Sequence, residues 1–148
     1  NTSYHVRAYA VNGKGVGYSA YVIIKTRSSA KATIVNMTAR NPSPSTLDVS
    51  ATISADGGAE ITERGFVYSS KGTPSVEECE KKIVMKGTVG EIGTTLTGLT
   101  GYSNYSIRAY AINKNGTAYS NTVTARTKKT DPSIDDPAFP ETKTIKNK

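Results

Sequence analysis

Residues 105–127 read YSIRAYAINKNGTAYSNTVTART, and this stretch decides the fold because the chain contains it twice. Residues 4–26 read YHVRAYAVNGKGVGYSAYVIIKT and align with it, without a gap, at an offset of 101 residues. Eleven of the 23 aligned positions are identical, which chance does not produce. An internal repeat at a fixed offset indicates a repeated structural unit. The offset is too long for a solenoid repeat, so it corresponds to one whole domain.

Apolar and polar residues alternate within each copy with the period of a β-strand. In the second copy one face of the predicted strand carries four apolar residues, namely Tyr105, Ile107, Ala109 and Ala111. The other face carries Ser106, Arg108, Tyr110 and Ile112. The residues that follow, 113–116, are rich in Asn and Gly, which tolerate positive φ and suit a hairpin into a final strand.

Similar runs recur upstream, and turn residues separate them at residues 35–39, 47–53, 61–69, 83–85 and 92–96. With the hairpin they make seven predicted strands and no long helical period, which favours two antiparallel sheets packed face to face. A single helical turn is compatible with residues 73–78, where Thr73 would be the cap and Pro74 the first helical residue.

The repeat also predicts the domain organisation. Residues 1–26 are expected to be the C-terminal hairpin of a preceding, incomplete copy, residues 27–31 a linker, and residues 32–128 a complete domain. Residues 129–148 combine Pro with charges and predict an extended linker or tail. Because a two-stranded hairpin is marginally stable in water, residues 1–26 are expected to need missing strands or another chain.

Five of the seven net positive charges lie outside the predicted domain. Residues 1–32 carry five basic side chains and no acidic one, whereas residues 33–128 carry ten basic and eight acidic ones. A nucleic-acid partner is therefore not expected, because such proteins gather basic residues on one face. No apolar run approaches the ~20 residues of a membrane-spanning helix, so no transmembrane segment is expected in this chain.

Few residues offer chemistry. Cys79 is the only cysteine and His5 the only histidine, so neither a disulfide scaffold nor a cysteine-rich metal site is expected. The acidic cluster at residues 77–80 adjoins Lys81 and Lys82, as in a solvated turn. The sequence predicts no catalytic residue, cofactor site or metal site, and therefore no enzyme.

Residues 99–116 resemble the late strands of fibronectin type III domains, which carry a leucine, a tyrosine six residues on, then Ala-x-Asn and glycine; here these are Leu99, Tyr105, Ala111-Ile-Asn113 and Gly116. Residues 61–69, ITERGFVYS, resemble the third strand of the variant common in bacterial surface and secreted multidomain proteins. The resemblance implies an all-β, immunoglobulin-like sandwich in which the Tyr105 hydroxyl bonds back to the loop after Leu99 as a tyrosine corner. Two departures are Gly101, where the family has proline, and the lack of tryptophan.

The resemblance implies a non-catalytic spacer, display and interaction module of a larger bacterial cell-surface or secreted protein, whose partners are other domains of the same polypeptide. An extracellular or cell-surface location follows from the same resemblance. Two alternatives stay open, each with a protein or polysaccharide ligand. A carbohydrate-binding module would use Tyr102, Tyr110 and Tyr119, and a protein-binding adhesin would use the loops at residues 56–60 and 114–116. The tentative ligand contacts are Arg108, Tyr110 and Tyr119, although a structural ladder on the outer face of the sheet also explains the repeated Arg-x-Tyr pair.

Overall fold

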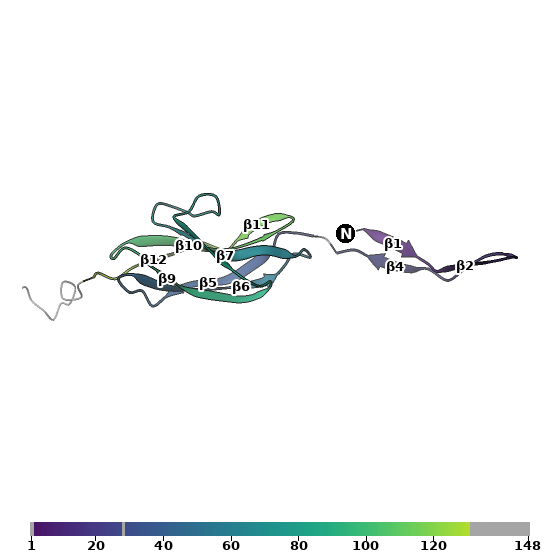
Figure 1. The fold of residues 1–148 in the computed structure, drawn as a ribbon, viewed down its shortest axis with the longest axis horizontal. Coiled ribbons are helices and arrows are strands. Elements are labelled where there is room, and N and C mark those ends of the chain that lie inside the picture. Colours follow the sequence, from purple (N-terminus) through teal and green to yellow (C-terminus); the bar gives the residue numbers. More distant parts are fainter. Residues whose placement is uncertain (1, 28, 131–148) are drawn as a thin grey trace, which may run out of the picture.

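The computed structural model describes residues 2–27 and 29–130, and every regular element in these residues is a β-strand (Figure 1). The first four strands belong to the hairpin and pair only with one another, as β1–β4 and β2–β3. Their bounds are Ser3–Val6 for β1, Tyr9–Asn12 for β2, Gly15–Tyr18 for β3 and Val22–Lys25 for β4. No helix in the described residues is long and apolar enough to cross a membrane.

The remaining strands form the predicted sandwich of two antiparallel sheets. One sheet has the order β5–β6–β9, with β5 at Thr33–Arg40, β6 at Thr46–Ala55 and β9 at Gly90–Thr97. In the other sheet β10 (Asn104–Asn113) lies beside β7 (Ile61–Ser69), which in turn pairs with β8 (Lys81–Met85). The second edge of β10 pairs with β11 (Gly116–Tyr119) and β12 (Val123–Arg126). The predicted all-β, immunoglobulin-like sandwich is confirmed.

The final strand differs from the prediction because it is divided into β11 and β12. β11 pairs with the end of β10 and β12 with its start. Between them, the Ser120 hydroxyl oxygen accepts a hydrogen bond from the Ala109 amide at 3.0 Å, and the Ser120 amide donates to the Ala109 carbonyl at 3.0 Å. A side-chain oxygen thus replaces one rung of the ladder and interrupts the strand.

The helical turn with which residues 73–78 are compatible does not form. The structure has bends there: the Ser75 amide donates to the Glu78 carbonyl at 2.9 Å, and the Glu78 amide donates to the Ser75 hydroxyl at 2.9 Å. Serine can close a turn with its own side chain, which offers the backbone an alternative to helix.

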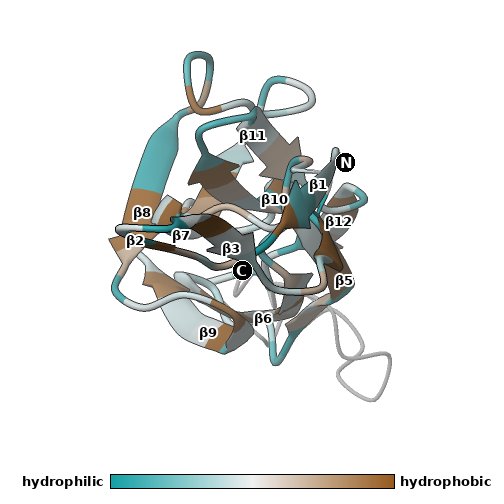
Figure 2. Cartoon of the chain, turned by 90° about the vertical axis from the view of Figure 1, so that its right-hand side faces the viewer, coloured by the Kyte–Doolittle hydropathy of each residue, from teal (hydrophilic) through white to brown (hydrophobic). Residues whose placement is uncertain are grey.

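The core lies between the two sheets and is built from the inward faces of their strands. Leu47 and Leu96 of one sheet, and Phe66 and Ile107 of the other, are each at most 1% exposed. Figure 2 shows apolar segments, coloured brown, on strands of both layers, including β6, β9 and β10. The predicted inward face of β10 is buried, since Tyr105, Ile107, Ala109 and Ala111 all belong to this cluster.

Tyr105 joins the core to the loop that precedes its strand. Its hydroxyl oxygen accepts a hydrogen bond from the Thr100 amide at 3.0 Å, and its side chain is 2% exposed. The Tyr68 ring meets it edge-on, with centroids 5.7 Å apart. Leu99 is buried beside this loop, at 6% exposure. This is the geometry of a tyrosine corner.

The two copies of the repeat have the same backbone pairing. Tyr4 pairs with Ile24 as Tyr105 pairs with Ala125, and each of the eight residue pairs in the hairpin has its counterpart 101 residues later. The Ser19 hydroxyl accepts from the Ala8 amide at 3.0 Å, as Ser120 does from Ala109. The division of the chain into domains stays a prediction. The tail predicted at residues 129–148 lies outside the described residues from position 131 onward.

We expect Tyr105→Phe to lower the free energy of unfolding of the sandwich by about 1–2 kcal/mol, because the Thr100 amide loses its acceptor. Urea denaturation followed by circular dichroism measures this change. The matched control is Tyr4→Phe, the equivalent tyrosine of the hairpin, which is 54% exposed and should change stability by less than about 0.5 kcal/mol. Equal effects at the two positions would contradict the assignment.

Candidate functional site

The tentative ligand contacts lie together on the outer face of the sheet that contains β10. Tyr110 and Tyr119 are directly opposite each other on β10 and β11. The Arg108 guanidinium carbon lies 4.1 Å from the centroid of the Tyr119 ring, within the range of a cation–π contact. Arg108 Nε also donates to the Ser120 carbonyl at 3.3 Å. We call Arg108, Tyr110 and Tyr119 the outer-face cluster.

The connection from β7 to β8, residues 70–80, contacts this cluster. In the ribbon it rises above the sheet that contains β10 (Figure 1). The Val76 amide donates to the Tyr119 hydroxyl at 2.9 Å, and an Arg108 guanidinium nitrogen donates to the Pro74 carbonyl at 3.5 Å. Pro74 is itself less than 2% exposed. The sandwich therefore uses the polar ends of Arg108 and Tyr119 to hold one of its own loops.

Tyr110 differs from the sequence expectation, because its side chain is not exposed. Its exposed fraction is 0%, and its hydroxyl donates to a carboxylate oxygen of Glu63 at 2.8 Å. Val67, which also lies outside the main core cluster, is equally buried at 0%. The β7–β8 connection thus encloses a second, small apolar layer on the outer face of the sheet. Tyr110 consequently has no free surface for stacking on a ligand.

Glu63 is the structural partner of Tyr110, and the sequence did not reveal it. Its carboxylate also pairs with the Lys82 ammonium at 3.0 Å, across the β7–β8 ladder. The hydrogen bonds from Lys82 and then from Tyr110 lower the pKa of Glu63 below its ordinary value. Burial first, and then the bond to Glu63, raises the pKa of Tyr110. No local sequence signal distinguishes Glu63 from other acidic residues, because the pair depends on strand register.

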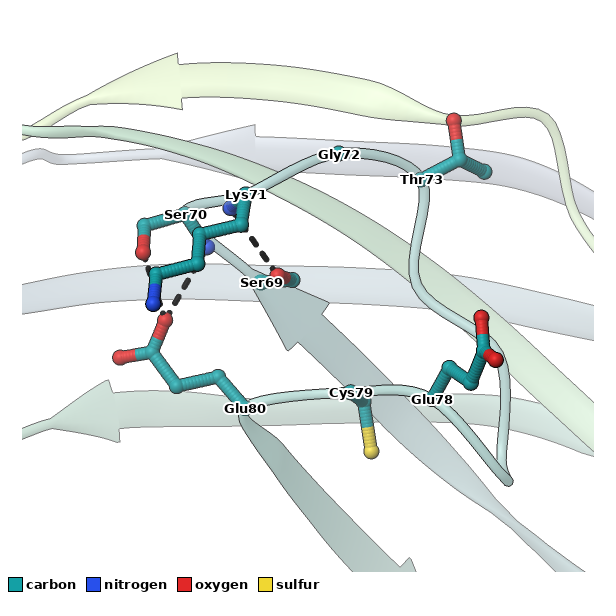
Figure 3. Close-up of a pocket in the computed structure, with 8 residues that line it drawn as sticks. All are labelled: Ser69, Ser70, Lys71, Gly72, Thr73, Glu78, Cys79 and Glu80. Atoms are coloured by element: carbon teal, nitrogen blue, oxygen red, sulfur yellow. Dashed lines mark hydrogen bonds between the residues drawn. The ribbon is translucent and has the colours of Figure 1, made fainter.

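An open hollow of about 570 Å³ lies along the β7–β8 connection (Figure 3). One Glu80 carboxylate oxygen accepts from the Ser70 amide at 3.0 Å and from the Ser70 hydroxyl at 2.8 Å, which closes the loop at its base. Figure 3 shows the Cys79 thiol and the Glu78 carboxylate pointing in different directions. The Cys79 thiol and the Glu78 carboxylate therefore do not converge on one point, as a shared chemical role would require. Within residues 2–27 and 29–130, no three His, Cys, Asp or Glu residues gather as a metal site would need.

Tyr102 lies in the connection between β9 and β10 and is 50% exposed. The Arg126 guanidinium carbon is 3.5 Å from its ring centroid, and the Lys129 ammonium is 4.8 Å from it. Two cations therefore already contact this ring. Together with the burial of Tyr110, this leaves Tyr102, Tyr110 and Tyr119 without a shared exposed platform.

The loops proposed for an adhesin, at residues 56–60 and 114–116, hold the linker instead. The Ala30 amide donates to the Gly57 carbonyl at 2.7 Å. The Asn113 side-chain amide donates to the Ala30 carbonyl at 2.8 Å and to the Asp56 carbonyl at 2.7 Å. The Asn115 side-chain amide adds a bond to the same Ala30 carbonyl at 2.9 Å. We call these contacts the linker clamp.

Comparisons with known proteins show likeness at the level of structure. No protein-family model matches the chain, and no curated protein matches it. A solved structure described as a myokine is 19% identical, with a TM-score of 0.50, and the match covers 68% of this chain and 100% of that one. The sensor domain of the anti-sigma factor RsgI4 of Pseudobacteroides cellulosolvens is 16% identical with a TM-score of 0.51, over 68% of this chain and 97% of that chain.

The FN1–FN3 domains of chicken CNTN1 are 20% identical with a TM-score of 0.51, and the match covers 86% of this chain and 43% of that chain. At such identities the likeness concerns the fold. The sandwich of residues 33–126 has the fibronectin type III fold, as the resemblance of residues 61–69 and 99–116 predicted.

We expect Glu63→Gln to destabilise the sandwich by about 1 kcal/mol near neutral pH, because two hydrogen bonds lose their charged acceptor. The folded-state pKa of Glu63 is lowered, so its contribution is complete above the unfolded pKa of about 4.3 and is lost as the pH falls through the folded value. The difference between variant and unmodified chain should therefore shrink as the pH falls below about 4.3. Urea denaturation at a series of pH values measures it.

Glu91→Gln serves as the control, because Glu91 is exposed on the other sheet. Its stability should follow that of the unmodified chain at every pH. A Glu63→Gln effect that is constant from neutral to acid pH would refute the electrostatic account of the Glu63–Tyr110 pair.

Proposed function

We propose that the chain is a non-catalytic spacer and interaction module within a tandem array of a larger, bacterial cell-surface or secreted protein. On this proposal its partners are the neighbouring domains of the same polypeptide, its location is outside the cell, and it needs no cofactor. The observation that carries the proposal is the linker clamp, because it ties the end of the sandwich to Ala30, a residue of the linker itself.

The linker has hydrogen-bonded residues close to both of its ends. On the hairpin side, the Thr26 amide donates to the Thr2 carbonyl at 2.8 Å. On the sandwich side the clamp begins at Ala30, and the Ser29 hydroxyl donates to the Asn115 side chain at 3.2 Å. Four residue steps separate Thr26 from Ala30, so their Cα atoms can be at most about 14 Å apart. Such a short tether restricts the angle between neighbouring units, which favours a spacer.

Close packing supports the clamp as a fixed contact. Gly57 has φ +72°, and a Cβ at that position would overlap the carbonyl oxygens of Ala30 and Lys31. Across the clamp, a Cβ on Gly116 would lie 3.1 Å from Cε of Lys31. Glycine at these two positions lets the linker backbone and the Lys31 side chain lie directly on the end of the sandwich.

The two alternative functions receive less support. Carbohydrate binding needs exposed and roughly coplanar aromatic rings, whereas Tyr110 is buried. The Tyr119 ring contacts the Arg108 guanidinium, and its hydroxyl accepts a hydrogen bond from the Val76 amide. An adhesin on this end of the domain needs free loops, whereas the Gly57 and Asn115 positions hold the linker.

The joint can be tested in a two-domain protein that joins residues 32–127 directly to residues 27–128, which reproduces the junction after Thr26 by repeat equivalence. Each unit contains the whole buried core of the sandwich. With spin labels at position 91 of each copy, in a Cys79→Ser background, pulsed electron paramagnetic resonance should give a narrow distance distribution. Asn113→Ala in the second copy should broaden it about twofold or more, because the clamp loses its central donor.

Asn113→Ala in the first copy is the matched control, since that copy has no linker to hold and the distribution should stay narrow. A broad distribution in the unmodified protein, or the same width with Asn113→Ala in either copy, would count against a spacer role.

A polysaccharide pull-down tests the carbohydrate alternative. The expected result is that insoluble bacterial and plant polysaccharides do not retain the unmodified chain above the level of Tyr102→Ala. Saturable retention that is lost in Tyr102→Ala or Arg108→Ala, with the fold intact by circular dichroism, would replace the spacer proposal with a carbohydrate-binding function.

A further inference from the structure

The hairpin of β1–β4 exposes the residues that the second copy of the repeat buries. Tyr4 and Val6 are 54% and 45% exposed, whereas their equivalents Tyr105 and Ile107 are 2% and 0% exposed. The difference arises from neighbours, because the pairing register is the same in both copies although β10 is continuous where the hairpin has β1 and β2. In the second copy β7 lies beside β10, and the sheet β5–β6–β9 packs across from it. The hairpin surface thus has the shape that such a five-stranded unit covers.

The outer face of the hairpin repeats the outer-face cluster. The Arg7 guanidinium carbon lies 3.9 Å from the Tyr18 ring centroid, as Arg108 does at 4.1 Å from Tyr119. The Tyr9 and Tyr18 rings are tilted neighbours with centroids 6.5 Å apart. Tyr9 is nevertheless 71% exposed, whereas its equivalent Tyr110 is 0% exposed under the β7–β8 connection. The cluster is assembled in the hairpin, and what differs is the covering loop.

We propose that the hairpin of residues 2–26 is a docking surface for a five-stranded β unit arranged like β5–β9. This unit adds a strand equivalent to β7 to the open edge of β1 and β2. It also places a carboxylate at the Tyr9 hydroxyl and covers Tyr18 with a loop amide. The carboxylate corresponds to Glu63 and the amide to Val76 in the complete sandwich. The inference rests on the proposed tandem array, in which the preceding repeat supplies that unit.

The open edge specifies how the unit docks. β10 pairs with β7 on one edge and with β11 and β12 on the other. In the described residues, β1 and β2 pair only with β4 and β3, which leaves the edge that corresponds to β7 unpaired. Exposed edges with unpaired amides and carbonyls readily accept another strand. The docking unit therefore contributes an antiparallel strand.

A second copy of this chain does not fit that requirement. Its own β7 already pairs with β10 over the range Ile61–Ser69, so it has no free β7 edge to offer. The docking unit must instead be one that lacks its own β10 equivalent.

Two positions indicate that the unit resembles β5–β9 without being identical to it. The hairpin has Ile24 where the sandwich has Ala125, and Gly17 where it has Ala118. Ala118 is 9% exposed, and Ala125 packs partly buried against the core. The docking unit should therefore have smaller side chains opposite Ile24 and larger ones opposite Gly17, since cores are close-packed.

The test joins residues 29–101 directly before Asn1 of the whole chain, which donates a β5–β9 unit at the spacing of the repeat. Hydrogen exchange is measured residue by residue at micromolar and tenfold lower concentrations. In the unmodified chain the amides of residues 3–25 should exchange with little protection, because a lone hairpin opens readily. In the fused chain the same amides should gain at least about 100-fold protection, whereas residues 33–126 of the original sandwich remain as before.

Four single variants and one double variant make the result specific. Val6→Asp in the fused chain should abolish the gained protection, because Val6 would enter a core. Tyr9→Phe in the hairpin and Glu63→Gln in the donated copy should each reduce the gained protection. The double variant should reduce it no further than the larger single effect, because both substitutions remove the same hydrogen bond. Ile24→Ala should increase protection by relieving overpacking against the donated copy, and it keeps the test valid if the fused hairpin docks poorly.

The proposal fails if residues 3–25 are strongly protected in the unmodified chain at both concentrations, or if protection in the unmodified chain rises with concentration, which would assign the surface to a second copy. It also fails if the fused chain with Ile24→Ala leaves the hairpin unprotected. Each of these outcomes is distinguishable from failure of the spacer proposal. The spacer proposal is tested by the width of the distance distribution in the two-domain protein, which depends on complete sandwiches and not on the hairpin.

Discussion

The structure depends on β10 (Asn104–Asn113), which is covered on both faces and paired on both edges. Its inward residues, such as Ile107 and Ala109, are 0% exposed in the main core, and its outward Tyr110 is equally buried under the β7–β8 connection. β10 therefore connects the main core on its inner face, the β7–β8 connection on its outer face and the neighbouring strands at its two edges. When the same sequence pattern lacks a β7 neighbour, as in β1 and β2, the pairing within the hairpin persists but the burial is lost.

The polar groups of the domain are directed toward its own structure. Glu63 accepts the Tyr110 hydroxyl, Tyr119 accepts a loop amide, and Asn113 donates to the linker. Residues that are prominent in the sequence because both copies retain them, such as Arg108 and Asn113, therefore have structural partners at known distances. This supports a module whose role is to hold its neighbours in place.

The sequence was sufficient to predict the strands and their inward faces. It was insufficient to predict which outward-facing side chains are buried and which partners they bond to. Alternation predicted the inward face of β10, because it depends on local periodicity. The bond between the Tyr105 hydroxyl and the loop after Leu99 was implied by the resemblance to fibronectin type III domains, and periodicity does not encode it. The burial of Tyr110 was not predictable, since alternation only assigns a residue to a face and gives no information on whether a loop covers that face. Glu63 was missed for a related reason, because its contact with Tyr110 depends on the pairing of β7 with β10. The break at Ser120 and the serine-closed turn at Ser75 arise from side-chain bonds to the backbone, which hydrophobic patterns do not encode.

The most direct test of a doubly covered β10 is a nuclear Overhauser spectrum of the chain in solution. The account predicts cross-strand contacts between Tyr110 and Gly65 and ring contacts between Tyr105 and Tyr68, which lie 5.7 Å apart between centroids. It also predicts contacts between the Tyr119 ring and the loop around Val76, because the Val76 amide bonds to the Tyr119 hydroxyl. Sequential helical contacts in residues 104–113, or a Tyr110 ring without contacts beyond its own strand, would contradict it.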